Sequence, residues 1–165
     1  DKNFMKDIHD QIHDGKIKSA IALCQRYDSP VARLVEKGIE RIGRPLQDIQ
    51  AAVENMGNVE VARLEKGLPM LATIAGGAPM IGFLGTVTGM IRAFFEMANA
   101  GNNIDITLLS GGIYEAMVTT VGGLFVGIIA YFGYNFLTSQ ISNLVFKMER
   151  TTIEFIDMLQ EPADN

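Results

Sequence analysis

Two long uncharged stretches dominate the pattern of apolar and polar positions along this chain. The first runs from Leu68 to Ile91, over 24 residues, and the second from Ala116 to Phe146, over 31 residues. As helices rising about 1.5 Å per residue they would reach about 36 Å and about 46 Å, and the hydrocarbon core of a bilayer is about 30 Å thick. We therefore predict an all-α, multi-pass membrane protein with two transmembrane helices in this sequence.

The second stretch is longer than a bilayer requires, and polar residues gather at its carboxyl side between Asn135 and Asn143. This end is therefore expected to leave the membrane as a continuing helix. We predict a cytoplasmic helical region over residues 1–66, transmembrane helices over 67–96 and 110–138, a short periplasmic loop over 97–109, and a cytoplasmic helical extension and tail over 139–165. Asp105 or Ser110 is expected to cap the second long helix.

Apolar positions recur at helical spacing through residues 1–64, and turn residues separate them into short helices. The expected breaks are Gly15, the turn Asp28-Ser29-Pro30 and the turn Gly43-Arg44-Pro45. Ser29 is suited to cap the helix that begins with Pro30. From Leu46 the spacing continues through Leu64, so we expect one helix that runs without a break into the first apolar stretch.

Charge is strongly segregated along the chain. Of the 14 Lys and Arg residues, 11 precede Leu68, and the link from Met97 to Asp105 contains none. Because basic residues collect on the cytoplasmic side of membranes, we predict that the link lies outside and that both ends of this segment lie in the cytoplasm. The formal net charge of −5 gives no reason to expect a nucleic-acid partner.

Few residues suggest metal or redox chemistry. Cys24 is the single cysteine, so no internal disulfide can form, and we expect a small buried thiol. His9 and His13 lie one helical turn apart and could form half of a metal site, but the sequence indicates no further ligands, so we expect a polar surface and no metal or cofactor. We also find no pairing of a nucleophile with a base and no phosphate loop, which argues against an enzyme.

Polar side chains within the two apolar stretches are candidates for function. They include Thr86, Thr119, Thr120 and, near the outer end of the second helix, Glu115. A membrane threonine can simply donate to the carbonyl four residues back in its own helix, and that alternative stays open for each one. An ionised carboxylate near the bilayer centre costs about 2.5 kcal/mol or more, so Glu115 would need a water-filled cavity or a partner there. At the membrane interface the free-energy cost would be small.

Small residues and a proline interrupt both stretches. Gly82, Gly85 and Gly89 precede a second set at Gly123 and Gly127, and the GxxxG spacings permit close helix contact, which we interpret as packing. Pro79 removes one helical hydrogen bond and is expected to kink the first span.

Three segments carry a resemblance to a known family. They are Ala78-Pro79-x-x-Gly82-x-x-Gly85-Thr86-Val87-x-Gly89-Met90, Gly112-Ile113-x-Glu115-Ala116-x-x-Thr119-Thr120-x-Gly122, and the soluble stretch from Ala22 to Arg33. Together they resemble the ExbB/TolQ/MotA family of proton-channel motor proteins, with the ExbB branch the most similar.

The resemblance implies a homo-oligomer, a pentamer, in the bacterial inner membrane, whose two spans line a central pore. It implies pore-facing hydroxyls at Thr86 and Thr120, with Thr119 beside them and Glu115 near the outer mouth. It also implies an ExbD-like single-span subunit in the pore, a TonB-like energy transducer and the proton as transported ion. The family's first span has no counterpart here, so we expect that an amino-terminal part precedes Asp1.

The expected function is that of the pore-forming stator subunit of a motor that uses the proton motive force to energise TonB-dependent outer-membrane transport. A TolQ-like role in outer-membrane maintenance is the near alternative. A non-conducting membrane scaffold and a soluble helical bundle with two buried apolar helices are alternatives from other classes.

Overall fold

The computed structural model describes residues 2–101 and 105–161 of the 165-residue chain. These residues form six helices in order: α1 (Lys2–His13), α2 (Ile17–Tyr27), α3 (Pro30–Glu40), α4 (Leu46–Leu64), α5 (Leu68–Asn99) and α6 (Ile106–Gln160). The described residues contain no β-strand, which confirms the all-α prediction. The chain divides into two compact units, Asp1–Lys66 with Gln140–Asn165, and Gly67–Ser139, so that α6 contributes to both.

The short helices of the first unit begin and end where the turn residues predict. Gly15 and Gly43 adopt positive φ angles of 75° and 104°, a region open to glycine at little cost. The Ser29 hydroxyl accepts a hydrogen bond from the backbone N–H of Ala32 at 3.1 Å, and Pro30 is the first residue of α3. The predicted cap therefore forms, and it satisfies one of the free N–H groups at the start of the helix.

The prediction of one unbroken helix from Leu46 into the first apolar stretch is wrong. Helix α4 ends at Leu64, and Gly67 takes the left-handed conformation with φ 92° before α5 begins. Pro69 lies in the first turn of α5, where its missing N–H costs nothing, but its ring would clash in a continuous helix. Apolar spacing carried no sign of this break, because the spacing on either side is helical.

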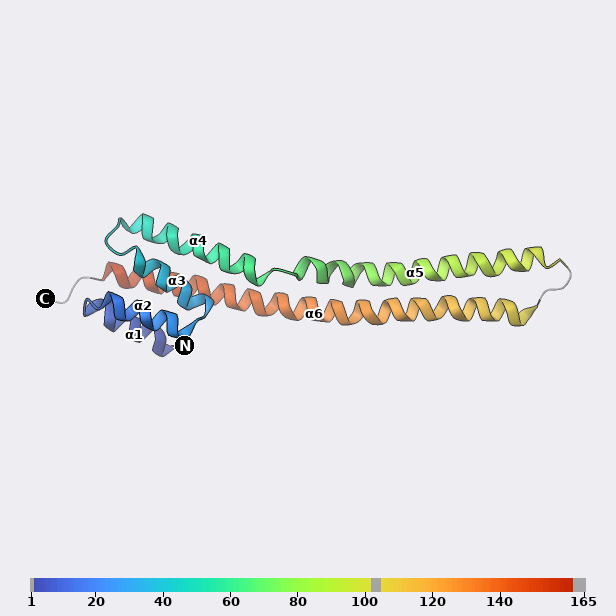
Figure 1. Cartoon of the computed structure of the whole chain (residues 1–165), viewed down its shortest axis with the longest axis horizontal. Helices are drawn as coiled ribbons and strands as arrows, with labels where there is room; N and C mark the ends of the chain where they lie inside the picture. The colour runs from blue at the N-terminus through green and yellow to red at the C-terminus, as the bar shows by residue number, and fades with distance from the viewer. Residues whose placement is uncertain (1, 102–104, 162–165) are drawn as a thin grey trace. The chain divides into compact units, whose positions relative to one another are not determined.

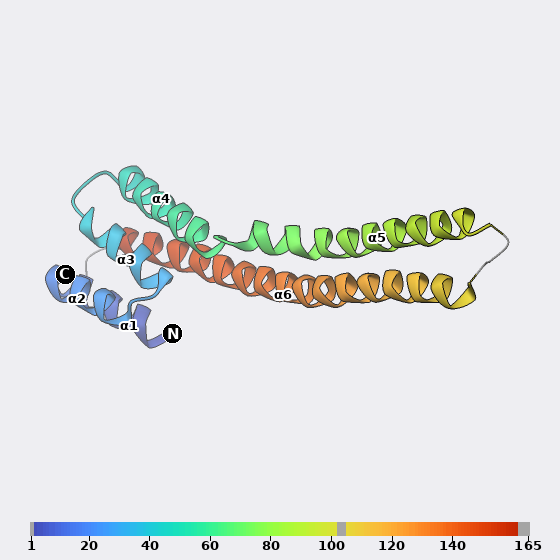
Figure 2. The same cartoon turned by 45° about the vertical axis from the view of Figure 1, so that its right-hand side comes forward.

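Apolar side chains from α1 to α4 and from the carboxyl part of α6 form the core of the first unit, which Figures 1 and 2 show as helices gathered along the red end of α6. Phe155, Ile8 and Leu34 are at most 2% exposed. Gly38 on α3 lies so close to α6 that a methyl group there would overlap the Phe155 ring. Cys24 belongs to this core, as predicted, and is 1% exposed.

An ion pair with a buried carboxylate joins α3 to α4 in the first unit. The guanidinium of Arg33 on α3 donates from Nε to Glu60 Oε1 at 2.6 Å and from a terminal nitrogen to Glu60 Oε2 at 2.9 Å. Glu60 on α4 is only 1% exposed. This two-bond contact lowers the pKa of Glu60 and keeps the carboxylate charged inside the fold.

The second unit consists of α5 and the amino-terminal part of α6, which lie side by side and antiparallel in Figures 1 and 2. Asp105 caps α6, since its carboxylate accepts from the Thr107 N–H at 2.9 Å. Large apolar side chains such as Ile81, Phe83 and Phe125 are 64% to 73% exposed. The most apolar stretches of the two long helical segments are only 6% and 17% buried. Core helices of a soluble bundle would be mostly buried, so these faces fit a lipid environment.

Candidate functional site

Small residues bring α5 and α6 into close backbone contact. A methyl group added to Gly123 would lie 2.5 Å from the Ala78 carbonyl oxygen, and one added to Gly82 would lie 2.8 Å from the Thr119 carbonyl oxygen. Gly85 and Gly89 lie in the same way against Thr119 and Ala116. Five glycines from the two predicted sets thus line one contact: Gly82, Gly85, Gly89, Gly123 and Gly127. Such close approach lets side-chain hydroxyls reach the carbonyls of the facing helix.

Pro79 also takes part in this contact. Its ring lies where a Gly127 side chain would otherwise be, with a distance of 2.6 Å from Pro79 Cδ to a methyl group added at Gly127. Helix α5 continues through Pro79 to Asn99. The proline is thus held by the opposite helix at a point where its own backbone lacks one N–H donor.

The hydroxyls of Thr86 on α5 and Thr120 on α6 are in direct contact across the helix pair. Thr86 Oγ1 also lies 2.9 Å from the Ala116 carbonyl oxygen, and Thr120 Oγ1 lies 3.3 Å from the Gly82 carbonyl oxygen. Each hydroxyl can donate one hydrogen and accept others, so the pair forms a short chain of exchangeable hydrogen bonds between the two backbones. Both side chains are half-buried.

The neighbouring threonines behave differently. Thr88 donates to the Leu84 carbonyl of its own helix at 3.0 Å, and Thr73 donates to the Pro69 carbonyl at 2.8 Å. Thr119 donates to the Ala116 carbonyl three residues back at 2.7 Å and lies 3.5 Å from the Gly82 carbonyl oxygen. Thr73 and Thr88 therefore bond within their own helix, which is the alternative that the sequence left open, whereas Thr86 and Thr120 connect two helices.

Glu115 lies on α6 at the wall of a cavity of about 710 Å³ between the ends of α5 and α6. Arg92, Glu96 and Asp105 line the same cavity, and Thr119 also lines it, beside Gly85. The Glu115 side chain makes no hydrogen bond or ion pair to the part of the chain that the structure describes. The structure thus brings Glu115 and Thr119 to one cavity, and the Thr86–Thr120 pair adjoins it through Thr119.

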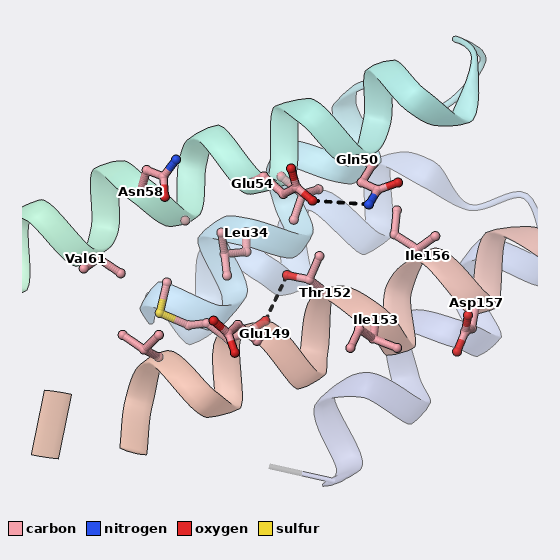
Figure 3. Close-up of a pocket in the computed structure, with 14 residues that line it drawn as sticks. Leu34, Gln50, Glu54, Asn58, Val61, Glu149, Thr152, Ile153, Ile156 and Asp157 are labelled. Atoms are coloured by element: carbon pink, nitrogen blue, oxygen red, sulfur yellow. Dashed lines mark hydrogen bonds between the residues drawn. The ribbon is translucent and has the colours of Figure 1, made fainter. Parts of the chain in front are cut away.

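A second cavity, of about 640 Å³, lies in the first unit between α4 and the carboxyl part of α6 (Figure 3). Leu34, Val53 and Ile156 form part of its apolar lining. Its polar side chains bond mainly within their own helices, as Gln50 does with Glu54 at 3.2 Å. This cavity has none of the threonines that sequence reasoning singled out.

Sequence reasoning missed a partner for the two histidines. His9 Nε2 and His13 Nε2 lie 2.8 Å and 3.1 Å from the same oxygen, Glu161 Oε2, just beyond the end of α6. The hydrogen bond that Glu161 accepts from His9 raises the pKa of His9, and the hydrogen bonds from His9 and His13 lower the pKa of Glu161. Since 152 positions separate His9 from Glu161, no local pattern could have indicated the contact.

The exposed apolar faces, the close glycine contact and the paired hydroxyls define a helical membrane protein with polar groups at the interface of its spans. Residues 26–150 match the MotA/TolQ/ExbB proton channel family. Because this match covers most of the chain, the protein belongs to that family, as the motifs in the sequence predicted.

Three relatives illustrate the breadth of the similarity. A biopolymer transport protein ExbB homolog of Methanothermobacter thermautotrophicus is 30% identical over 86% of this chain and 50% of its own length. The biopolymer transport protein ExbB of Xanthomonas campestris pv. campestris is 36% identical over 54% of this chain and 35% of its own. The Tol-Pal system protein TolQ of Haemophilus influenzae is 34% identical over 64% of this chain and 46% of its own. The chain spans about half the length of these relatives or less.

Proposed function

We propose that this chain is the pore-forming stator subunit of a proton-driven motor in the bacterial inner membrane, and that it energises TonB-dependent outer-membrane transport. The observation that carries the proposal is the hydroxyl contact between Thr86 and Thr120, which joins two otherwise apolar helices. Membership of the proton channel family and the similarity to proteins named ExbB support it.

The chemistry of the threonine pair suits proton movement. A hydroxyl can accept a proton on one side while it donates on the other, and it places no fixed charge in the membrane. Gly82 and Ala116 carbonyls lie within reach to accept hydrogen bonds as the hydroxyls turn. Thr119 and Glu115, on the wall of the neighbouring cavity, would extend this polar path toward the outer side.

The proposal includes partners that supply what one chain lacks. A relay of neutral hydroxyls needs an ionisable group to take up and release the proton, and a single-span ExbD-like subunit with a carboxylate would supply it inside a homo-oligomeric ring, a pentamer by family resemblance. Each proton that moves inward releases about 2.3 kcal/mol per 100 mV of membrane potential, which can bias a rotation step. A TonB-like transducer would carry the resulting motion to the outer membrane.

Valine substitution tests the proposal, since valine keeps the shape of threonine and removes the hydroxyl. In a strain that lacks its own copy of the gene, we expect Thr86→Val and Thr120→Val to be produced at normal levels but to fail to support growth on scarce iron. Thr73→Val on the same helix is the matched control, because the Thr73 hydroxyl donates to the Pro69 carbonyl of its own helix, and this variant should grow normally. Normal growth of both variants would remove the threonine pair from the mechanism.

A TolQ-like role in outer-membrane maintenance is the second candidate, favoured by the similarity to the Haemophilus influenzae Tol-Pal system protein TolQ. The same proton chemistry would serve it. A deletion strain separates the two, because loss of iron-limited growth indicates the transport role and sensitivity to detergents indicates the envelope role.

A non-conducting scaffold is the third possibility, in which the threonines only hold α5 against α6. Proton flux into liposomes that contain the complex with its single-span partner distinguishes it. We expect flux that Thr86→Val abolishes, whereas a scaffold would give the same background with and without the substitution.

A further inference from the structure

We propose that His9, His13 and Glu161 form a binding site for a divalent transition-metal ion, with Zn²⁺ as the ion that fits the donors best. The ligand atoms are His9 Nε2, His13 Nε2 and a carboxylate oxygen of Glu161, and they all lie within 4.8 Å of one another. The site lies in the first unit, apart from the threonine pair, and nothing in the proton-channel function requires it.

The geometry places three donors around one point. The two Nε2 atoms lie 2.8 Å and 3.1 Å from Glu161 Oε2. Zinc binds imidazole nitrogen and carboxylate oxygen at about 2.0 to 2.2 Å, which separates tetrahedral ligands by about 3.3 Å. Entry of the ion in place of the shared hydrogens would therefore lengthen the two nitrogen-to-oxygen distances by only a few tenths of an ångström. The two ring nitrogens lie within 4.8 Å of each other and would reach the same spacing by small rotations of the partly exposed imidazoles.

The sequence spacing favours the same arrangement. Histidines four residues apart on one helix present their rings on one face, and the two ring centres lie 4.3 Å apart. Two imidazoles and one carboxylate form a donor set that zinc uses with a fourth position left for water. Asp10 Oδ1 lies 3.7 Å from His9 Nδ1, the ring nitrogen that would not bind the ion, and a small movement would let this carboxylate accept a hydrogen bond there and orient the ring.

The site is accessible and charge-compatible. The side chains of His9, His13 and Glu161 are 38%, 28% and 51% exposed, so an ion can enter directly from water. Two neutral imidazoles with Glu161 carry one negative charge, which the ion would offset. A bound ion would tie α1 to the end of α6, across 152 positions of sequence, and would thereby stabilise the first unit.

The test is a titration of the purified full-length complex with Zn²⁺ alone, in competition with a chromophoric chelator. The affinity tag must contain no histidine, because histidines in a tag would bind zinc themselves. The sequence has only 2 histidines and its one cysteine is buried, so an untagged chain offers few competing ligands of these types. We expect one zinc ion per chain and a rise in the thermal unfolding temperature on zinc addition. We expect the double variant His9→Ala/His13→Ala to lose the site, and Glu161→Gln to weaken binding by about tenfold or more.

Glu154→Gln, at an exposed position on α6 outside the cluster, is the matched control and should bind as the unaltered protein does. Far-ultraviolet circular dichroism checks that each variant keeps its helix content without metal. Absence of zinc binding by the unaltered complex would overturn the proposal and leave the three side chains as a hydrogen-bonded cluster. Equal binding by the double histidine variant would also overturn it, because the ion would then lie elsewhere.

Discussion

Gly123 on α6 faces the backbone of Ala78 on α5 so closely that a Cβ atom at Gly123 would lie 2.5 Å from the Ala78 carbonyl oxygen. Its chain neighbour Gly122 has open space at the same position. The two adjacent glycines therefore form a natural pair for testing how α5 and α6 pack.

We predict that Gly123→Ala pushes the two helices apart and lowers the free energy of unfolding of the purified protein by about 1 to 3 kcal/mol, as overpacked contacts do. Gly122→Ala should be neutral or slightly stabilising, since alanine favours helix over glycine by about 1 kcal/mol. Unfolding in detergent, followed by circular dichroism, measures both. Equal losses for the two variants would show that the α5–α6 contact does not explain the effect.

The contact between Thr86 and Thr120 predicts that the two hydroxyls act as one unit. Each valine substitution should lower proton flux to the same small residual rate in liposomes that also contain the single-span partner, and the double variant should be no worse than either one. Groups that act together lose their function at the first removal, so their effects do not multiply. Effects that multiply in the double variant would instead show two independent hydroxyls.

The ion pair between Arg33 and Glu60 predicts a pH dependence of stability. Arg33 lowers the pKa of Glu60 below its ordinary value of 4.5. The charged carboxylate therefore stabilises the fold fully above about pH 4.5, and this contribution disappears as the pH falls through the lower pKa of the folded state.

Glu60→Gln should cost about 2 to 3 kcal/mol at pH 7, since it removes the buried carboxylate from Arg33 and leaves only the exposed Asp28 as its charged partner. The variant should lose less stability than the unaltered protein between pH 5 and about pH 3. Glu54→Gln, at an exposed position on the same helix, is the control and should change little. Parallel pH profiles of Glu60→Gln and the unaltered protein would contradict the prediction.

The buried position of Cys24 predicts an unreactive thiol. Burial raises the pKa of Cys24 to about 12, and the residue is 1% exposed, so both the thiolate and the access that alkylation requires are lacking at pH 8. A maleimide should label it only after unfolding. A cysteine placed at exposed position 19 of the same helix by Ser19→Cys should react at once, and rapid labelling of Cys24 in the folded protein would show that the core of the first unit opens.

Local features of the sequence were sufficient for much of the fold. The cap at Ser29, the cap at Asp105 and the turns at Gly15 and Gly43 each depend on residues within one helical turn. Lengths of uncharged sequence were enough to indicate the membrane spans, since the bilayer thickness sets a fixed minimum. The order of the motifs was enough to indicate the family that the comparison confirmed.

Relations between distant segments needed the tertiary structure. Which threonines meet depends on the register of α5 against α6, in which the backbone of Gly82 faces that of Gly123. Thr86 and Thr88 carry the same side chain on the same helix, but Thr86 contacts Thr120 on α6 whereas Thr88 bonds to its own helix. The pairing of Arg33 with Glu60 on α4 could not be predicted either, because helical spacing shows which face of a helix is apolar but not which segment packs against it.

The chain by itself therefore determined where the short helices of the first unit begin, which helices are apolar enough for a membrane and to which family the chain belongs. Those properties come from neighbouring residues and from composition. Only the three-dimensional packing decided that Thr86 meets Thr120 and that Glu161 joins two histidines from the opposite end of the sequence. Those outcomes depend on distances between segments that no local pattern encodes.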